Sequence, residues 1–330
     1  MARALFLRKE DGNVHPYVGA VERESLPEGD VLVSVSHSGL NYKDGMAITG
    51  RGKIIRGDYP FIPGIDLAGE VAESNSETFA PGDLVVGTGW GLGENHWGGY
   101  SQLQRVRSEW LIPLPGGLSS ESAMIVGTAG LTAMLSIMAL EGTGLHPSNG
   151  EVVVTGASGG VGSLAVAMLA AFGYTVVGST GSVEAQAYLR DLGASRIIDR
   201  GELGDGARRP LDTARWAGAV DVVGGSTLAA VISQLDRHAS VASCGLTGGV
   251  QLETTVYPFI LRGVNVLGID SNMCPADRRR DAWERISELL SQEILERIKA
   301  YTISLEDIPA YSVRILAGEI TGRVVVDVHR

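Results

Sequence analysis

The chain has 330 residues, of which 44% are hydrophobic and 20% charged, so it is long enough for two globular domains and too apolar for a disordered protein. Lysine and arginine total 27 against 38 aspartate and glutamate residues, and the formal charge of -11 argues against a general affinity for nucleic acid. Cys244 and Cys274 are too few for a disulfide framework, and charges follow Met1 too soon for a signal peptide. We therefore expect a cytoplasmic protein.

Short β-branched runs separated by proline and glycine turns fill the first 120 residues. Val31–Val35 and Asp83–Val86 are strand candidates, and they predict a β-rich domain. Ser119 is a capping candidate for a long helix that reaches Leu140. This uncharged stretch is long enough to span a membrane, but its glycine, threonine and serine residues favour a buried core helix.

Strands and helices alternate from residue 151 to residue 269, which predicts a doubly wound parallel sheet with crossover helices. The expected strands are Glu151–Thr155, Tyr174–Gly178, Arg196–Asp199, Ala219–Val223, Ser240–Cys244 and Val264–Ile269, and the expected helices are Val161–Phe172 and Val183–Leu192. A charged amphipathic helix, Asp281–Ile298, and a strand, Gly322–Val328, are expected to follow. We expect Arg278, Arg279 and Arg280 at the start of that helix to be exposed to solvent.

A glycine-rich turn joins the strand at Val152–Val154 to the next helix. Gly156, Gly159, Gly160 and Gly162 stand where backbone amides and a helix N-terminus can bind a pyrophosphate. The preceding apolar strand and the following apolar helix supply the required context, so the turn predicts dinucleotide binding.

The same letters fit the glycine signature of short-chain dehydrogenases, Thr-Gly-x-x-x-Gly-x-Gly. Those enzymes also use a tyrosine with a lysine four residues later. None of the nine tyrosines here has lysine at that offset, and the turn lies in the middle of the chain. We therefore reject that family and keep the dinucleotide.

The second predicted strand leads into Ser179, Thr180, Gly181 and Ser182, where an NAD enzyme would present an acid to the ribose hydroxyls. No acid stands at these four positions. Small hydroxyl side chains can donate to a 2′-phosphate, and Arg200 can add positive charge at the same edge. The sequence thus favours NADPH, the alternative being a neutral loop of loose specificity.

The β-rich region followed by a nucleotide fold resembles the medium-chain dehydrogenase/reductase superfamily, in its zinc-free, quinone-oxidoreductase-like branch. The resemblance spans nearly the whole chain. Its motifs are Leu40-Asn41-Tyr42-Lys43-Asp44, Ile48-Thr49-Gly50-Arg51-Gly52-Lys53, Pro63-Gly64-Ile65-Asp66, Gly89-Trp90-Gly91-Leu92-Gly93-Glu94-Asn95-His96-Trp97-Gly98-Gly99 and Cys244-Gly245-Leu246-Thr247-Gly248-Gly249.

This resemblance implies a GroES-like catalytic domain of residues 1–122 and 299–330 and a Rossmann NADPH-binding domain of residues 123–298. It implies NADPH-dependent reduction of acryloyl-CoA to propionyl-CoA, with hydride transfer to the β-carbon and protonation of the α-carbon. We also expect a homodimer that binds neither nucleic acid nor a membrane.

Zinc-using members of the superfamily carry Cys in a Gly-x-Cys-x-x-Asp segment and His in a Gly-His-Glu segment. Here Asn41 and Ile65 take those two positions, so a tetrahedral zinc site would lack ligands. The six histidines show no metal spacing, and His96 is the one of interest because it lies in the glycine-rich loop. We expect no metal.

By resemblance, the cofactor pocket is expected to contain Tyr42, Ser158, Gly159, Gly160, Val161, Ser179, Thr180, Gly181, Ser182, Arg200, Leu246, Ile260 and Ser271. Tyr42 and Asn41 are the candidates to donate a hydrogen bond to the substrate thioester oxygen, because a metal-free site needs another electrophile. Tyr42 could instead only pack beside the nicotinamide ribose. Arg51, Lys53 and Arg56 form a basic cluster that could receive the CoA phosphates or could simply be solvated.

Two other functions fit the same residues. Reduction of a quinone or of a free enone or enal would use the same fold without a CoA-binding surface. A non-catalytic NADPH-binding protein is the alternative from a different class, because a fold does not establish an activity.

Overall fold

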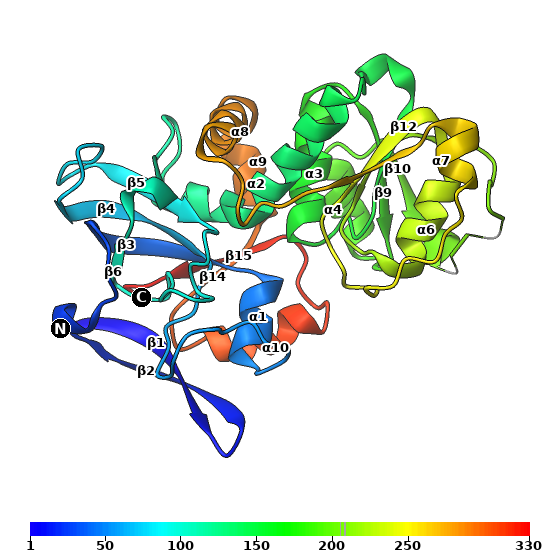
Figure 1. Ribbon diagram of the computed structural model, residues 1–330. Coiled ribbons are helices and arrows are strands. Elements are labelled where there is room, and N and C mark those ends of the chain that lie inside the picture. Colours follow the sequence, from blue (N-terminus) through cyan, green and yellow to red (C-terminus); the bar gives the residue numbers. More distant parts are fainter. Residues whose placement is uncertain (205, 208) are drawn as a thin grey trace. The chain divides into compact units, whose positions relative to one another are not determined.

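The computed structural model describes residues 1–204, 206–207 and 209–330 (Figure 1). The chain forms two compact units. The first contains Met1–Thr128, Asn272–Ser287 and Leu295–Arg330, and the second contains Ala129–Ser271 and Glu288–Ile294. The predicted limits of the family domains, 1–122 with 299–330 and 123–298, stay a prediction.

The first unit is built on an antiparallel hairpin and a seven-stranded sheet. In the sheet the order is β14-β15-β3-β4-β5-β7, and β6 also pairs with β3. Figure 1 shows the late strands β14 and β15 in the same sheet as the blue β3. The strands are β1 (Ala2–Glu10), β2 (Asn13–Val21), β3 (Val31–Leu40), β4 (Asp66–Ser74), β5 (Leu84–Thr88), β6 (Leu103–Val106), β7 (Leu111–Pro113), β14 (Lys299–Ile303) and β15 (Arg323–Asp327).

The second unit is a six-stranded, wholly parallel sheet with the order β10-β9-β8-β11-β12-β13. Strand order reverses between β8 and β11, which is where open α/β sheets bind their ligands. The strands are β8 (Glu151–Val154), β9 (Thr175–Thr180), β10 (Arg196–Asp199), β11 (Trp216–Asp221), β12 (Leu235–Ser243) and β13 (Asn265–Gly268). The helices are α3 (Gly160–Ala171), α4 (Ala185–Asp191), α5 (Gly201–Gly204), α6 (Gly225–Gln234) and α7 (Tyr257–Arg262).

Burial explains why the parallel sheet and the β1–β2 hairpin differ in their sequence patterns. All six residues of β11 are buried, as expected for a strand covered on both faces, whereas β2 alternates exposed and half-buried residues for most of its length. The remaining helices are α1 (Tyr42–Ile48), α2 (Ser120–Gly142), α8 (Ala276–Leu289), α9 (Gln292–Ile298) and α10 (Ile308–Leu316). The predicted α/β architecture with a separate β-rich unit is confirmed.

The long helix α2 begins after Ser119, whose hydroxyl accepts the Ser122 N–H at 3.1 Å, as the predicted cap requires. It is long and apolar enough to cross a membrane, but 83% of its most apolar window is buried within the protein. Gly127 interrupts the helix with φ 49° and ψ -155°. These features identify α2 as a kinked core helix.

Two expectations about the segment after residue 275 are wrong. The predicted helix Asp281–Ile298 is two helices, α8 and α9, and the Ser291 hydroxyl between them accepts the Ile294 N–H at 3.4 Å. Arg279 was expected at the surface, but it is 1% exposed. Its Nη1 donates to the Thr88 carbonyl and hydroxyl at 2.6 and 2.8 Å, and its guanidinium lies 5.0 Å from the Trp90 ring centroid. These partners replace water around the charge.

Candidate active site

The glycine-rich turn leaves the carboxyl end of β8 and enters α3. Gly156 has φ +55°, and Gly159 is the extended N-cap residue of the 12-residue helix. A Cβ on Gly162 would lie 2.3 Å from the Gly156 carbonyl oxygen, so only glycine lets the first turn of α3 approach this loop. Ser158 precedes α3 and Val161 lies in its first turn, where the leading N–H groups have no carbonyl partner within the helix. The geometry fits a dinucleotide pyrophosphate.

The loop after β9 is tied to that turn. Ser158 Oγ and Thr180 Oγ1 lie 3.1 Å apart, and the Arg200 N–H donates to the Thr180 carbonyl at 3.1 Å. A Cβ on Gly181 would lie 2.5 Å from Arg200 Nε, so the absence of a side chain at Gly181 lets the arginine lie across the loop. Ser179 and Thr180 are buried, whereas Arg200 is exposed. The structure brings these predicted residues together at one edge of the sheet.

An acid that sequence reasoning missed stands in the same loop. Ser182 Oγ donates to Glu184 Oε2 at 3.0 Å and accepts the Ala185 N–H at 3.1 Å. The Glu184 backbone N–H and the Ser182 hydroxyl lower the pKa of this fully exposed carboxyl. In the sequence, Glu184 stands two positions after Ser182, beyond the four positions where an acid is expected in an NAD enzyme.

The remaining cofactor candidates of the second unit are more dispersed. Leu246 follows β12 and lies beside the end of β11. The close approach is visible at the preceding residue, Gly245, where a Cβ would lie 2.0 Å from the Val222 carbonyl oxygen. Ile260 is an exposed residue of α7. The Ser271 hydroxyl accepts the Thr132 hydroxyl at 2.8 Å.

In the first unit, a buried polar network surrounds Asn41. Its Nδ2 donates to Asp44 Oδ2 at 3.1 Å and to Asp66 Oδ2 at 2.8 Å, and its Oδ1 accepts Arg323 Nη1 at 3.0 Å. Asn41 is 8% exposed and the three charged partners are at most 3% exposed. The Asn41 amide is therefore fully hydrogen-bonded inside the protein.

The network holds two carboxylates and one guanidinium. Burial, followed by repulsion from Asp66, raises the pKa of Asp44 to about 7. Asp44 also accepts the N–H groups of Asn41 and Ile65 at 2.9 and 3.0 Å. Burial lowers the pKa of Arg323, while the two carboxylates oppose that effect.

Asp66 connects this network to the kink of α2. Its carboxylate accepts the Thr128 hydroxyl at 2.5 Å and the Thr128 N–H at 3.1 Å. The Asp66 side chain thus takes the amide that the break at Gly127 leaves without an intrahelical partner. Asp66, Thr128 and Arg323 were absent from the predicted site because their sequence positions gave no sign that they meet.

Tyr42 is the first residue of α1 and is 38% exposed. Asn41 and Asp44 form a capping box around this first helical turn, and Lys43 Nζ lies 2.8 Å from Glu94 Oε1 on its other side. The described residues offer the Tyr42 hydroxyl no hydrogen-bond partner, so it can donate to a ligand.

The basic cluster is exposed. Arg51, Lys53 and Arg56 are each exposed, and no acid in the part of the chain that the structure describes pairs with their side chains. The Arg56 N–H donates to the Glu94 carbonyl at 2.7 Å, which fixes the backbone beside Lys43. These side chains can receive an anionic group.

The metal ligand positions of zinc-using relatives are filled here by Asn41, which belongs to the network, and Ile65, which is 4% exposed. Among residues 1–204, 206–207 and 209–330, no group of three histidine, cysteine or acidic side chains is arranged to hold a metal ion. His96 Nδ1 lies 2.9 Å from the Trp97 carbonyl, and burial lowers the pKa of its ring. His96 therefore serves the loop structure.

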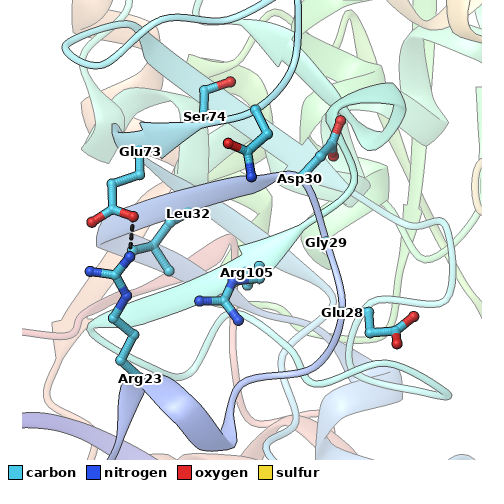
Figure 2. Close-up of a pocket in the computed structure, with 9 residues that line it drawn as sticks. Arg23, Glu28, Gly29, Asp30, Leu32, Glu73, Ser74 and Arg105 are labelled. Atoms are coloured by element: carbon cyan, nitrogen blue, oxygen red, sulfur yellow. Dashed lines mark hydrogen bonds and ion pairs between the residues drawn. The ribbon is translucent and has the colours of Figure 1, made fainter.

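Figure 2 shows a surface cavity of about 350 Å³ in the first unit. Arg23, Arg105, Glu28, Asp30 and Glu73 line it, and Arg23 is paired with Glu73. The mixture of charges gives the cavity no preference for anions, and it contains none of the predicted site residues.

Comparison with known proteins places these features in a family. Residues 27–116 match the alcohol dehydrogenase GroES-like domain, and residues 160–292 match the zinc-binding dehydrogenase family. The yhdH oxidoreductase from Salmonella enterica, solved with NADP, is 49% identical with a TM-score of 0.96, covering 99% of both chains. The chain belongs to the medium-chain dehydrogenase/reductase superfamily.

Within that superfamily, the chain is similar to further bacterial proteins over nearly its full length. It is 51% identical to acrylyl-CoA reductase AcuI of Ruegeria pomeroyi over 100% of both chains. The yhfP protein of Bacillus subtilis, solved with NAD bound, is 48% identical with a TM-score of 0.95, covering 99% of both chains.

Proposed function

We propose that this protein is an NADPH-dependent reductase that converts acryloyl-CoA to propionyl-CoA. The observation that carries the proposal is the 51% identity with an acrylyl-CoA reductase along the complete length of both chains. The cofactor is NADPH because Ser182 and Arg200 line the loop after β9 and relatives of similar identity have been solved with NADP or NADPH. The balanced reaction consumes one acryloyl-CoA, one NADPH and one proton.

When bound, NADPH supplies the hydride that goes to the substrate β-carbon, and the α-carbon takes a proton. The turn at Ser158–Val161 holds the pyrophosphate on the N–H groups of α3. Ser179–Ser182 and Arg200 would hold the adenosine ribose and its 2′-phosphate. These residues of the second unit would fix the cofactor.

The Tyr42 hydroxyl is the proposed donor to the thioester oxygen, where negative charge develops as the hydride arrives. Asn41 was an equal candidate from sequence, but its amide is bonded to Asp44, Asp66 and Arg323. We therefore assign Asn41 the role of positioning the first turn of α1. Arg51, Lys53 and Arg56 are the proposed contacts for the CoA phosphates.

Reduction of a quinone or a free enone or enal is the second candidate, favoured by a Bacillus subtilis relative at 48% identity whose name provisionally assigns it to the quinone oxidoreductases. A non-catalytic NADPH-binding role is the third. Single-turnover oxidation of NADPH by acryloyl-CoA, benzoquinone and acrolein in parallel separates them. Fastest turnover of acryloyl-CoA, with propionyl-CoA as product, is expected. Faster turnover of benzoquinone or acrolein would overturn the proposal. The absence of turnover with all three substrates would also overturn it.

We further propose a homodimer. Among the described residues, strand β13 is the last strand of the parallel sheet and pairs with β12 alone, and its Val266 is 37% exposed. Tyr257, Ile260 and Leu261 are exposed on α7, which contacts β12. A second copy could pair with the open strand edge and cover these side chains. The presence of only two cysteines, Cys244 and Cys274, in 330 residues supports a cytoplasmic location.

A further inference from the structure

We propose that Glu184 sets the cofactor selectivity of this protein, by competing with the 2′-phosphate of NADPH for the Ser182 hydroxyl and so reducing the preference over NADH. The inference rests on the proposed nucleotide site at the end of β9. It concerns a residue that lies outside the four loop positions inspected in the sequence.

The hydrogen bonds of Ser182 carry the argument. A serine hydroxyl has one hydrogen, and in this structure that hydrogen points to Glu184 Oε2 at 3.0 Å. The hydroxyl oxygen accepts the Ala185 N–H at 3.1 Å, and the Ser182 N–H donates to Thr180 Oγ1 at 3.2 Å. The first of these bonds holds the Ser182 hydroxyl, and the second holds the Ser182 backbone. Ser182 can therefore donate to a phosphate only by releasing Glu184.

Two opposite charges flank the same hydroxyl. Arg200 lies against Gly181, the residue before Ser182, and Glu184 is bonded to Ser182 itself. The fully exposed Glu184 carboxyl has a pKa below its ordinary value, so it is ionised at neutral pH. A phosphate at this edge is attracted by Arg200 and repelled by Glu184. The net preference for NADPH is the difference between the two effects.

Glu184 has the opposite effect on the binding of NADH. An unphosphorylated ribose presents a 2′-hydroxyl, which can donate a hydrogen bond to a carboxylate, as acids at the corresponding edge of NAD-binding folds do. Glu184 can accept that bond without losing charge complementarity. One side chain thereby weakens NADPH binding and supports NADH binding.

Direct binding of nucleotide fragments tests this without turnover. Isothermal titration with adenosine 2′,5′-bisphosphate and with 5′-AMP compares the wild type with Glu184→Gln and Glu184→Ala. Glu184→Gln removes the charge and keeps an acceptor for Ser182. We expect Glu184→Gln to bind the bisphosphate about three- to tenfold more tightly, with unchanged or weaker 5′-AMP binding and a smaller effect at high salt. Glu184→Ala frees the Ser182 hydrogen and should tighten binding further.

Glu151→Gln is the matched control. It removes the same charge at the amino end of β8, opposite the cofactor edge, where Glu151 pairs with the exposed Arg196. It should leave the ratio of the two affinities unchanged. Arg200→Ala should weaken the bisphosphate about ten- to a hundredfold and spare 5′-AMP.

The outcomes separate this inference from the proposed site. If Arg200→Ala selectively weakens the bisphosphate but Glu184→Gln leaves the affinity ratio unchanged or lowers it, Glu184 has no role in selectivity and the site stands. If neither variant changes the ratio, the nucleotide edge lies elsewhere and both ideas fail. A ratio that rises equally in Glu151→Gln would reduce the effect to net charge and also overturn the inference.

Discussion

Asn41 and Tyr42 are neighbours in sequence with different chemical capacity. The Asn41 amide is surrounded by Asp44, Asp66 and Arg323, whereas the Tyr42 hydroxyl at the start of α1 is free to meet a ligand. The network holds the helix start, and the tyrosine projects from it. Each can therefore be tested by a different measurement.

Tyr42→Phe keeps the ring and removes the donor. If the hydroxyl stabilises the developing charge on the thioester oxygen, single-turnover hydride transfer at saturating NADPH and acryloyl-CoA should slow by roughly 10²- to 10³-fold while NADPH affinity changes little. Tyr17→Phe, at an equally exposed tyrosine of β2, is the control. A normal transfer rate with weaker NADPH binding would show that Tyr42 only orients the cofactor.

Asp44 makes stability depend on pH. Its pKa is raised from 3.8 to about 7 in the folded protein, so folding favours the protonated carboxyl. The contribution is fully present below about pH 4 and is lost as pH rises to about 7. Unfolding free energies measured across this range should fall for the wild type relative to Asp44→Asn. A constant difference between the two proteins would show that Asp44 does not titrate there.

Sequence reasoning could propose residues for the nucleotide site because they follow strand ends within one αβ pattern. It could not show that Asn41 is saturated, since Asp66 and Arg323 are brought to it only by β4 and β15. Arg279 was placed at the surface for the same reason. The Thr88 carbonyl and hydroxyl and the Trp90 indole ring, which contact its charge, come from a segment far from Arg279 in the sequence.

Among the elements, the packing of helix α2 depends on the break at Gly127. The kink residue Gly127 has φ 49°, and a Cβ there would lie 2.6 Å from Asp66 Oδ2 and 3.0 Å from Arg323 Nη2. Gly127→Ala should therefore destabilise the protein by about 2–4 kcal/mol, which thermal or denaturant unfolding would detect. Gly142 lies at the last position of the same helix, where an added Cβ would have no atom within 4 Å. Gly142→Ala should therefore leave the stability nearly unchanged. Equal stability of the two variants would contradict this account.

Regular elements were predictable where the local pattern agreed with the tertiary environment. The strand Arg196–Asp199 was predicted with the observed bounds, because β-branched residues and turn signals mark it clearly. The break between α8 and α9 was not predicted, because the amphipathic pattern of charged residues continues through Ser291. The hydrogen bond from the Ile294 N–H to the Ser291 hydroxyl marks the start of the second helix. The Gly127 kink likewise depends on distant partners.

At the scale of the whole molecule, the open β13 edge predicts the assembly. Val266→Lys would place a charge on the exposed strand surface and should convert the proposed dimer to a monomer in sedimentation velocity at micromolar concentration. Val313→Lys, at an exposed valine of α10, should leave the dimer intact. A Val266→Lys protein that still sediments as a dimer would place the interface elsewhere.

Catalysis should not require zinc, because Asn41 and Ile65 stand where zinc-using relatives carry their ligands. Exhaustive chelation is expected to leave the single-turnover rate unchanged, and purified protein should contain less than stoichiometric zinc by elemental analysis. Zinc that is removed together with activity and restores it when added back would contradict this expectation.

The strand order in the first unit also determines when its sheet can form during synthesis on the ribosome. Strand β15 (Arg323–Asp327) lies between β14 and β3, and its Arg323 completes the charge network around Asn41. The seven-stranded sheet and this network can therefore be completed only when almost the whole chain has been translated. The nucleotide-binding sheet ends at β13 and can assemble earlier. The parallel sheet of the second unit can therefore form before the unit that carries Tyr42. During translation, chaperones would encounter a first unit that is only partly folded.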